Sequence, residues 1–452
     1  MKRRDVLKAT ALGALMARDT AFGREGQARP APSDRIRVGM IGVGGFGYGS
    51  NLPDFLGNPD VDVVAICDVF EPHLERAVAR AGGKATRHRE YRRLLDDREI
   101  DAVVITTPEH WHALMCLDAC DAGKDVYVEK PAGHHIRDSR LMVEAARRNN
   151  RVVQVGTQQR SGAHFQRAVK YVQEGRIGDV HYAACWNHTP RRPPRPTVTG
   201  GPPPGMDWDL WLGPAPKLPY DEVWSVGRRG YWDFWGGMIT EWGSHLTDVV
   251  LWAMNAQGPR SVVAAGGQFF DKAGEIPDTL QVSYTYPTFL FHYSVLNHNT
   301  YGLNGDPGAA RFGSYGMQFH GTKGTLFVDR EGFRITPQTM RHEEPPPSAP
   351  ASDGRPPAFY YTTEILAEQS DTSDQHRPHV RNFLDCVKSR KRPAADIEAG
   401  HHANTVCRLG NIAYRVGRRL DWDAAKEEVA GDAEANRLVV GEYRAPWTPK
   451  GL

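Results

Sequence analysis

A glycine-rich turn between an apolar run and a helical pattern constrains the fold of this chain more than any other feature. Residues 36–42 form an apolar run that leads directly into Gly42-Val43-Gly44-Gly45-Phe46-Gly47. In this GxGxxG spacing the first glycine permits a tight turn and the second lets the backbone approach a phosphate. The third allows a strand and a helix to pack closely. The free N–H groups at the start of the helix would then face the phosphates of a dinucleotide.

An acidic residue ends the next apolar run, as a dinucleotide site requires. Asp68 follows the run 61–67 and lies twenty-one residues beyond Gly47. A carboxylate at this point accepts hydrogen bonds from the ribose hydroxyls and repels the extra phosphate of NADP. The other interpretation of Asp68 is an ordinary helix cap, because Glu71-Pro72 follows it. The two signals together predict NAD as the cofactor and make NADP the less favoured one.

The first part of the chain alternates short apolar runs with amphipathic segments of helical spacing. The runs cover residues 36–42, 61–67, 102–106, 125–128 and 152–155. The helical segments between them cover residues 71–81, 110–122 and 137–149. Near-continuous apolar strands separated by helices are typical of a parallel sheet with helices on both faces. We therefore expect a doubly wound α/β Rossmann domain over residues 34–157.

From residue 158 onward, expected strands follow one another with few helices between them. These strands cover residues 180–186, 261–269, 279–286, 289–296, 316–320 and 325–329. Several alternate apolar and polar residues, which is typical of a mostly antiparallel sheet with one uncovered face. Proline and glycine predict surface loops at 189–205 and 343–357, and a helix is expected near 380–387. Residues 158–452 are therefore expected to form an α+β domain with a large open sheet.

Charge and cysteine content exclude several classes of function. The 452 residues include 56 lysines and arginines and 54 aspartates and glutamates. No overall field therefore attracts nucleic acid or an anionic membrane. No apolar run in the sequence approaches the length of a membrane-spanning helix. Six cysteines in a chain of this length, none of them in a CxxC pair, do not make a disulfide scaffold.

The N-terminal segment, residues 1–33, differs from the rest of the chain. Residues 2–8 (KRRDVLK) follow the twin-arginine export pattern, and a short apolar run over 9–17 comes next. Arg18 and Asp19 end that run early, so a disordered basic tail is the other interpretation. The export interpretation predicts a periplasmic protein that folds before transport, whereas the other predicts a cytoplasmic protein.

The tripeptide Glu129-Lys130-Pro131, which ends the run 125–128, makes the chain recognisable. With it, the chain resembles the Gfo/Idh/MocA family, named for glucose–fructose oxidoreductase, inositol dehydrogenase and a rhizopine-catabolism protein. Further motifs that carry the resemblance are residues 107–112 (TPEHWH), 207–213 (DWDLWLG) and 236–245 (GGMITEWGSH). Residues 379–385 and 443–447 (YRAPW) resemble an exported subgroup of this family.

The glycine turn and the resemblance together imply one set of cofactor contacts. The expected residues are Gly42, Gly44, Gly45, Phe46, Gly47, Asp68, Thr107, Pro108, His110, His112, Glu129, Lys130 and Gln158. His110 and His112 are expected to begin the helix beneath the nicotinamide. The family favours a histidine at the position of His112 and an asparagine where this chain has Glu109.

A predicted catalytic pair follows from the chemistry of hydride transfer. Removing a hydride from a secondary alcohol requires a group that takes the hydroxyl proton, and histidine titrates near working pH. A nearby ammonium lowers the cost of the developing alkoxide. His245 and Lys130 would supply these groups, and their family counterparts are assigned such roles. Glu241, where the family usually has aspartate, lies one helical turn before His245 and would orient the imidazole or hold a substrate hydroxyl.

A wider set of residues is expected around the substrate. This set contains Arg160, His188, Trp208, Tyr231, Trp232, Glu241, His245 and Asp248. Simpler interpretations exist: His245 would be a packed helix residue, Lys130 a surface lysine, and the aromatic residues supports for the core or the sheet. Glu241, His245 and Asp248 also have a spacing that suits zinc, but no cysteine cluster accompanies them. No metal is expected.

Three classes of function remain open from the sequence. The first is a dehydrogenase that oxidises a hydroxyl of a sugar, glycoside or polyol with NAD. The second is a glycoside hydrolase or epimerase that oxidises the sugar transiently and returns the hydride from a cofactor that is never released. The third is a non-catalytic sugar-binding protein that has kept the fold. Since an open sheet leaves a face to cover, a homo-oligomer, either a dimer or a tetramer, is expected.

Overall fold

The structure is a computed structural model that describes residue 31 and residues 34–190, 197–226, 228–300, 314–342 and 360–451. The predicted loop 343–357 lies outside the described residues. So does the expected export segment, apart from residue 31.

Six parallel strands form the first sheet, in the order β3-β2-β1-β4-β5-β6. Their bounds are β1 (Ile36–Ile41), β2 (Val61–Cys67), β3 (Thr86–His88), β4 (Ala102–Ile105), β5 (Asp125–Val128) and β6 (Val153–Val155). The expectation of a doubly wound Rossmann sheet is therefore confirmed. Only β3 was not predicted, because its three residues are polar and largely exposed.

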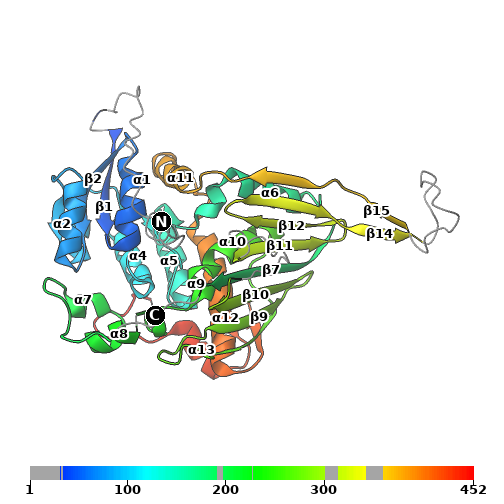
Figure 1. The fold of residues 1–452 in the computed structure, drawn as a ribbon. Coiled ribbons are helices and arrows are strands. Elements are labelled where there is room, and N and C mark those ends of the chain that lie inside the picture. The colour runs from blue at the N-terminus through cyan, green and yellow to red at the C-terminus, as the bar shows by residue number, and fades with distance from the viewer. Residues whose placement is uncertain are drawn as a thin grey trace, which may run out of the picture.

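Helices cover both faces of this sheet (Figure 1). Apolar side chains of α3 (Tyr91–Leu95), α4 (His112–Asp121) and α5 (Ile136–Arg148) pack on one face. Those of α1 (Leu52–Leu56) and α2 (Glu71–Arg80) pack on the other. The glycine turn leads into α1 through a short π-helical turn, Gly47–Asn51.

A helix from far along the chain completes the second of these layers. The helix α11 (His376–Ser389) lies beside α1 in Figure 1. Its residues Phe383 and Leu384 are fully buried in the same cluster as Phe55 of α1 and Tyr127 of β5. The core of the first sheet therefore depends on residues more than two hundred positions further along the chain.

The second sheet has ten strands in the order β16-β13-β12-β11-β7-β10-β9-β8-β17-β18. All neighbouring pairs are antiparallel except β10 and β7, which confirms the predicted open, mostly antiparallel sheet. The predicted strands are β7 (Val180–Thr189), β8 (Ser261–Gly267), β9 (Thr279–Thr285), β10 (Leu290–Asn297), β11 (Tyr315–Gly321) and β12 (Gly324–Asp329). Further strands are β13 (Gly332–Pro337), β16 (Glu368–Asp371), β17 (Leu420–Asp423) and β18 (Glu428–Val429).

One face of this sheet packs on helices and forms the largest hydrophobic core of the molecule. The covering helices include α6 (Ala163–Gln173), α10 (Gly243–Met254), α12 (Ile397–Val416) and α13 (Ala433–Val440). The opposite face carries polar side chains such as Gln281, Ser283 and His292, which hydrogen-bond to one another. A separate hairpin of β14 (Thr339–His342) and β15 (Tyr360–Thr363) extends away from the sheet (Figure 1).

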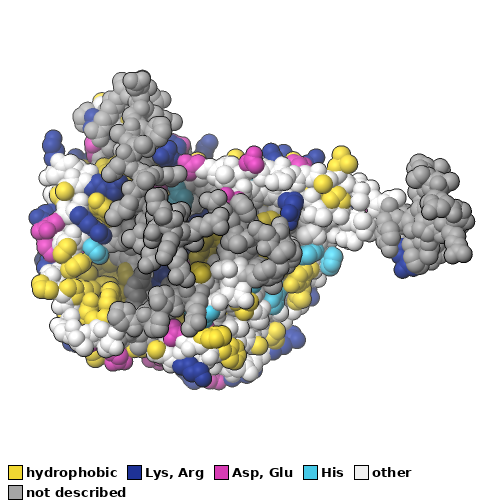
Figure 2. Space-filling view, viewed as in Figure 1, with side chains coloured by type: hydrophobic (Ala, Val, Ile, Leu, Met, Phe, Trp, Pro, Cys, Tyr) yellow, Lys and Arg dark blue, Asp and Glu magenta, His cyan; other side chains and the backbone are white. Residues whose placement is uncertain are grey.

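The described part of the surface shows no accumulation of one charge on the face in Figure 2, where basic and acidic side chains are interspersed. Within the described parts of the chain, no helix is both long and apolar enough to cross a membrane.

Candidate active site

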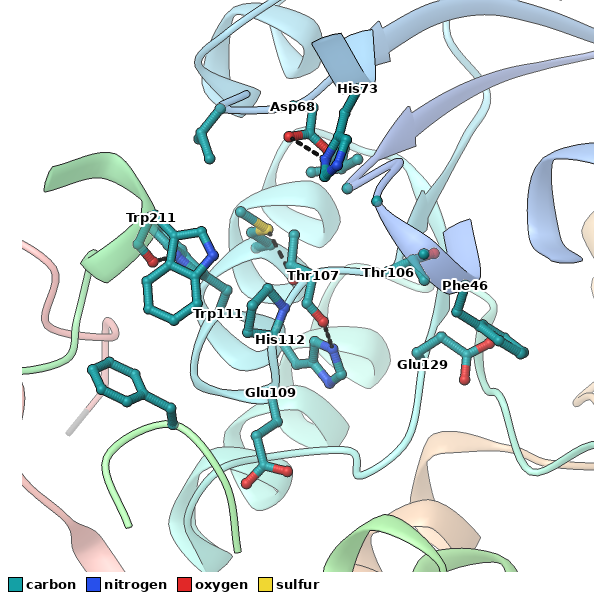
Figure 3. A pocket seen from close by; sticks show the side chains of 18 of the residues that line it. Phe46, Asp68, His73, Thr106, Thr107, Glu109, Trp111, His112, Glu129 and Trp211 are labelled. Atoms are coloured by element: carbon teal, nitrogen blue, oxygen red, sulfur yellow. Dashed lines mark hydrogen bonds and ion pairs between the residues drawn. The ribbon is translucent and has the colours of Figure 1, made fainter. Parts of the chain in front are cut away.

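A cavity of about 870 Å³ lies at the carboxyl ends of the strands of the first sheet. Its lining includes the glycine turn, the segments after β2, β4 and β5, and the start of α11. The second region contributes a segment around α7 (Trp208–Leu212) and α8 (Tyr220–Val226). It also contributes the region of α9 (Met238–Glu241) and α10, and the turn between β12 and β13. Figure 3 shows mainly the side that belongs to the first sheet, together with Trp211 of α7. Ligand sites in doubly wound folds lie at this edge of the sheet.

The glycine turn has the backbone that the sequence predicts. Gly42 has a φ of +82°, and a Cβ there would come within 2.9 Å of the backbone of Thr106. A Cβ on Gly47 would overlap the carbonyl oxygen of Gly42, so the third glycine brings the turn and the helix into contact. A Cβ added at Gly45 would meet no described atom within 4 Å, which leaves room for a phosphate. This geometry fits the pyrophosphate of a dinucleotide.

Asp68 lines the cavity and braces the glycine turn at the same time. Its carboxylate accepts hydrogen bonds from the backbone N–H groups of Val43 at 2.8 Å and Phe70 at 3.0 Å. Nδ1 of His73 lies 3.5 Å from this carboxylate, and the two side chains face each other in Figure 3. The two interpretations of this residue are therefore not exclusive, since the carboxylate holds the turn and still borders the cavity.

Lys130 comes from the turn that follows β5, where the Lys130–Pro131 peptide bond is cis. Its ammonium donates a hydrogen bond of 2.9 Å to the backbone carbonyl of Glu241, on the other side of the cavity. Burial lowers the pKa of this lysine, although the neighbouring carboxylates of Glu241 and Glu129 oppose the shift. This hydrogen bond therefore joins the two halves of the site.

Glu129 lies beside Lys130 and is fully buried. Its carboxylate accepts hydrogen bonds from the amides of Asn51 at 3.2 Å and Gln158 at 3.5 Å. Burial raises its pKa to about 7, against the opposing effect of Lys130. A Cβ on Gly156 would overlap this carboxylate, so the glycine makes room for it.

His245 lies in the first turn of α10 and is buried at the cavity wall. Burial, followed by the positive charges of Arg330 and Lys130, lowers its pKa well below the usual value. The imidazole is therefore neutral at pH 7, and its Nδ1 has no hydrogen-bond partner among the described residues. A neutral, buried imidazole with an unused nitrogen can accept a proton from a ligand.

Glu241 ends the short helix α9 (Met238–Glu241), and α10 begins only at Gly243. Its carboxylate forms an ion pair of 2.8 Å with Arg229, which also borders the cavity. The sequence did not indicate Arg229, because it lies in a separate 3₁₀ turn, Arg228–Gly230. Among the described residues, the hydrogen-bond partner of the Glu241 carboxylate is thus this arginine rather than His245.

The residues after β4 contact the turn at Pro131, which follows β5. His112 faces two backbone carbonyl oxygens, that of Pro131 at 2.8 Å and that of Thr107 at 2.9 Å. Thr107, Pro108 and His112 all line the cavity, and their contact with the cofactor stays a prediction. His110 is not part of the lining, and its Nε2 lies 3.1 Å from the carbonyl oxygen of Trp211.

Glu109, where the family usually has asparagine, is the centre of a buried ion-pair network. Arg408 of α12 lies 2.7 Å from its carboxylate, His134 lies at 3.1 Å, and the N–H of Gly236 donates at 2.9 Å. Burial alone would raise the pKa of Glu109, but Arg408 and His134 outweigh it and hold that pKa well below its usual range. The carboxylate therefore links the first sheet to the glycine pair before α9.

Several predicted substrate residues lie away from the cavity lining. Asp248 forms an ion pair of 2.7 Å with Arg160, whose guanidinium lies over the ring of Trp252. His188 lies near Ser294 on the polar face of the second sheet, with Nε2 and Oγ 3.1 Å apart. Both positions follow from long-range packing that the sequence does not display, and substrate contact by these residues stays a prediction.

The predicted aromatic residues support the wall rather than form it. Trp208 stacks on Trp211 with ring centroids 4.6 Å apart, and only Trp211 of the two lines the cavity. The hydroxyl of Tyr231 lies 3.4 Å from Glu222, and Arg415 lies over the ring of Trp232. Their direct role in substrate binding likewise stays a prediction.

A segment of the second region covers the carboxyl end of β2. Met206 forms an isolated β-bridge with Phe70, and the carbonyl of Gly205 accepts a 3.0 Å hydrogen bond from the N–H of Glu71. We call residues 203–224 the strap. Its side chains that line the cavity are Pro203, Met206, Leu210, Trp211, Tyr220 and Trp224. The sequence pointed to the tryptophans of this segment but not to its position over the cofactor half.

Within the described residues, no group of three or more histidine, cysteine, aspartate or glutamate side chains is arranged to hold a metal ion.

The architecture is that of a two-domain oxidoreductase with an NAD-binding Rossmann domain. A family model described as "Oxidoreductase family, NAD-binding Rossmann fold" matches residues 36–157. A second, described as "Oxidoreductase family, C-terminal alpha/beta domain", matches residues 195–287 and 359–449. The two matches together cover more than half of the chain, and the chain belongs to the Gfo/Idh/MocA family of oxidoreductases.

Solved structures share this fold at low sequence identity. The aldose-aldose oxidoreductase from Caulobacter crescentus, complexed with glycerol, is 16% identical with a TM-score of 0.62. The WlbA dehydrogenase from Bordetella pertussis, in complex with NADH and UDP-GlcNAcA, is 21% identical with a TM-score of 0.61. Each alignment covers 86% of this chain and 99% of the other.

Curated relatives match a shorter part of the chain. An alpha-N-acetylgalactosaminidase from Shewanella oneidensis is 30% identical over 163 residues, which are 34% of this chain and 35% of that protein. The chain thus matches about a third of the length of such relatives.

Proposed function

We propose that this protein is an NAD-dependent oxidoreductase that transfers a hydride between the nicotinamide and a secondary hydroxyl of a sugar, glycoside or polyol. One observation carries the proposal: Lys130 of the first domain and His245 of the second line the same cavity as the glycine turn. The proposal agrees with the fold that the chain shares with sugar-processing dehydrogenases.

The residues around the cavity fit NAD. The glycine turn and the start of the following helix would hold the pyrophosphate, and Asp68 borders the same part of the cavity. When bound, NAD would supply the acceptor for the hydride. Thr107, Pro108 and Lys130 line the part of the cavity that leads toward His245.

The residues on the other side would handle the proton. His245 is neutral, so it can accept the hydroxyl proton as the C–H bond breaks. Lys130 uses one donor on the carbonyl of Glu241 and keeps further N–H groups for the substrate oxygen, where negative charge develops. The pair of Glu241 and Arg229 offers oriented hydrogen-bonding groups for another hydroxyl of the substrate.

The experiment that tests this proposal is a screen of sugars and polyols with the purified protein and excess NAD, followed by absorbance at 340 nm. NADH should accumulate in proportion to the sugar consumed. A protein that binds no dinucleotide in equilibrium titration would contradict the proposal.

A second candidate function is glycoside hydrolysis or epimerisation by transient oxidation, with the hydride returned to the sugar. Two observations favour it: part of the chain is similar to an alpha-N-acetylgalactosaminidase, and the strap covers the cofactor half of the cavity. Cleavage of an aryl glycoside without net NADH, abolished when the cofactor is removed, would select this candidate. Steady NADH production would select the dehydrogenase.

The export and assembly of the protein are also proposals. The twin-arginine pattern of residues 2–8 supports transport to the periplasm. The uncovered face of the second sheet, with Val263 46% and Leu290 41% exposed, supports a homo-oligomer. Cell fractionation tests the export, and sedimentation of the full chain tests the assembly.

A further inference from the structure

One cation in the cavity, Arg330, has no ion-pair partner among the described residues. Arg330 lies in the turn between β12 and β13 and lines the cavity near His245. Its guanidinium lies over the ring of Trp242, 4.9 Å from the ring centroid, and Trp242 in turn contacts His245 with centroids 6.1 Å apart. The guanidinium is thus held beside the expected reaction centre.

In this respect Arg330 differs from three other arginines whose side chains are mostly buried. Arg160, Arg229 and Arg408 each form an ion pair with an acidic side chain, at 2.7, 2.8 and 2.7 Å. Among the described residues, no carboxylate lies within ion-pair distance of Arg330, and its buried Nε has no hydrogen-bond partner. Its charge is therefore desolvated without an ion pair from these residues, and the Glu129 carboxylate, which lies beyond ion-pair distance, offsets only part of that cost.

The titratable groups around Arg330 provide no carboxylate within ion-pair distance among the described residues. Lys130, another cation of the cavity, is bonded to a backbone carbonyl rather than to a carboxylate. His245 and His376 both have pKa values lowered by burial and by Arg330 itself, so they are neutral donors or acceptors at pH 7. A nearby acid, Glu129, has a pKa of about 7 and already accepts the amide of Asn51.

We propose that Arg330 binds a carboxylate carried by the substrate, so that the preferred substrates are acidic sugars, such as uronic acids or their glycosides. The inference deepens the proposed function and rests on it. A guanidinium presents parallel N–H groups that match the two oxygens of a carboxylate. Its stacking on Trp242 fixes the plane of these donors, and an acidic ligand supplies the missing countercharge.

The pyrophosphate of the cofactor is the other source of anionic oxygens. The ring of His376 contacts Phe46 of the glycine turn, with centroids 6.0 Å apart. The glycine turn therefore lies near the part of the cavity that contains Arg330. The glycine turn, however, has its own backbone donors for phosphate. Arg330 instead contacts Trp242, the neighbour of His245, which places its charge at the hydride end.

The test uses a matched pair of ligands, glucuronate and glucose, and three variants of the full chain loaded with NAD. Arg330→Met removes the charge, and Arg330→Lys keeps the charge but not the parallel N–H groups of the guanidinium. As a control, Arg334→Met removes an exposed arginine of the neighbouring strand β13. Calorimetry gives the affinity for each sugar, turnover gives kcat/KM, and fluorescence titration gives the affinity for NAD.

The wild type should prefer the acid over the neutral sugar by about 30-fold or more, as expected for a charge-assisted bidentate contact. Arg330→Met should remove this preference and leave the affinity for NAD within about threefold. Arg330→Lys should keep part of the preference, and Arg334→Met should keep all of it. Because Arg330→Met removes a desolvated charge that has no ion pair among the described residues, the Tm of the free protein should not fall, which shows that the variant is folded.

Two outcomes would overturn the inference: equal affinity of the wild type for both sugars, or a loss of NAD affinity in Arg330→Met that matches the loss for the acid. Acid binding that depends on Arg330 but leads to no turnover of any sugar would support the inference and contradict the proposed hydride transfer. Turnover of neutral sugars without any preference for acids would support the proposed hydride transfer and contradict the inference.

Discussion

The two ends of the cavity are built in different ways. At the cofactor end, the glycine turn and Asp68 come from one stretch, residues 42–68, and are joined by a direct hydrogen bond from the N–H of Val43 to the Asp68 carboxylate. The reaction end brings together Lys130, Glu241 and Arg330 from three distant parts of the chain. Local sequence thus determines where a dinucleotide binds, whereas tertiary packing determines which molecule meets it.

This difference explains where sequence variation has its effects. At the cofactor end a backbone shape is required, and a single added methyl group at Gly47 would overlap the turn. At the reaction end the requirements are charge and position, which several side chains share. Substitutions at the two ends should therefore separate cofactor binding from turnover.

The largest effect is expected at the reaction end. Replacing His245 by alanine removes the proposed proton acceptor, and Lys130→Met removes the group proposed to stabilise the alkoxide. Each should lower kcat by roughly 100-fold or more while NAD still binds, as measured by turnover and by fluorescence titration. Full activity in either variant would contradict the catalytic assignment.

At the cofactor end, Asp68→Ala should have a smaller effect, and it should change the affinity for NAD rather than kcat. The variant loses one hydrogen bond to Val43 of the glycine turn, one to Phe70, and the carboxylate expected to border the ribose. The affinity for NAD should fall by roughly 10-fold to 100-fold, with kcat at saturating NAD little changed. An unchanged affinity in a titration against NAD would show that Asp68 only caps the turn.

The pair of Arg229 and Glu241 offers a finer test of the reaction end. In Glu241→Gln the backbone carbonyl that holds Lys130 remains, but the ion pair to Arg229 is lost. We expect KM for the sugar to rise about tenfold, because an interaction with charged groups is removed, and kcat to change less. A fall in kcat equal to that of Lys130→Met would instead place the carboxylate in the chemistry.

The smallest effect concerns pH. The folded-state pKa of His245 lies well below 6.5, so the neutral base persists as pH falls through that value. The acid limb of kcat/KM should therefore lie below pH 6.5, and activity should be lost only when the imidazole is protonated. Arg330→Met removes one of the charges that lower this pKa, and should move the limb upward by a fraction of a pH unit.

Much of the fold could be predicted, because its signals are local. The apolar runs gave five of the six strands of the first sheet, and the glycine turn, Asp68, Lys130 and His245 all line the cavity. The strand β3 has no apolar pattern from which to predict it.

The remaining parts could not be predicted, because they depend on partners that are distant in sequence. Arg330 lies in a short turn, and nothing in the neighbouring residues shows that it faces His245. The pairing of Arg408 with Glu109 spans nearly three hundred residues. The spacing of Asp248 and His245 suggested a shared face, but Arg160 holds the carboxylate elsewhere.

The return of α11 to the first sheet has a consequence for the integrity of the molecule. Phe383 and Leu384 fill a space beside Phe55 that no described residue before position 158 occupies. A fragment that stops at Thr157 would expose this apolar surface to water and be prone to aggregate. The NAD-binding domain therefore does not complete its core by itself. The ribosome must synthesise the chain as far as α11 before this core can form in full.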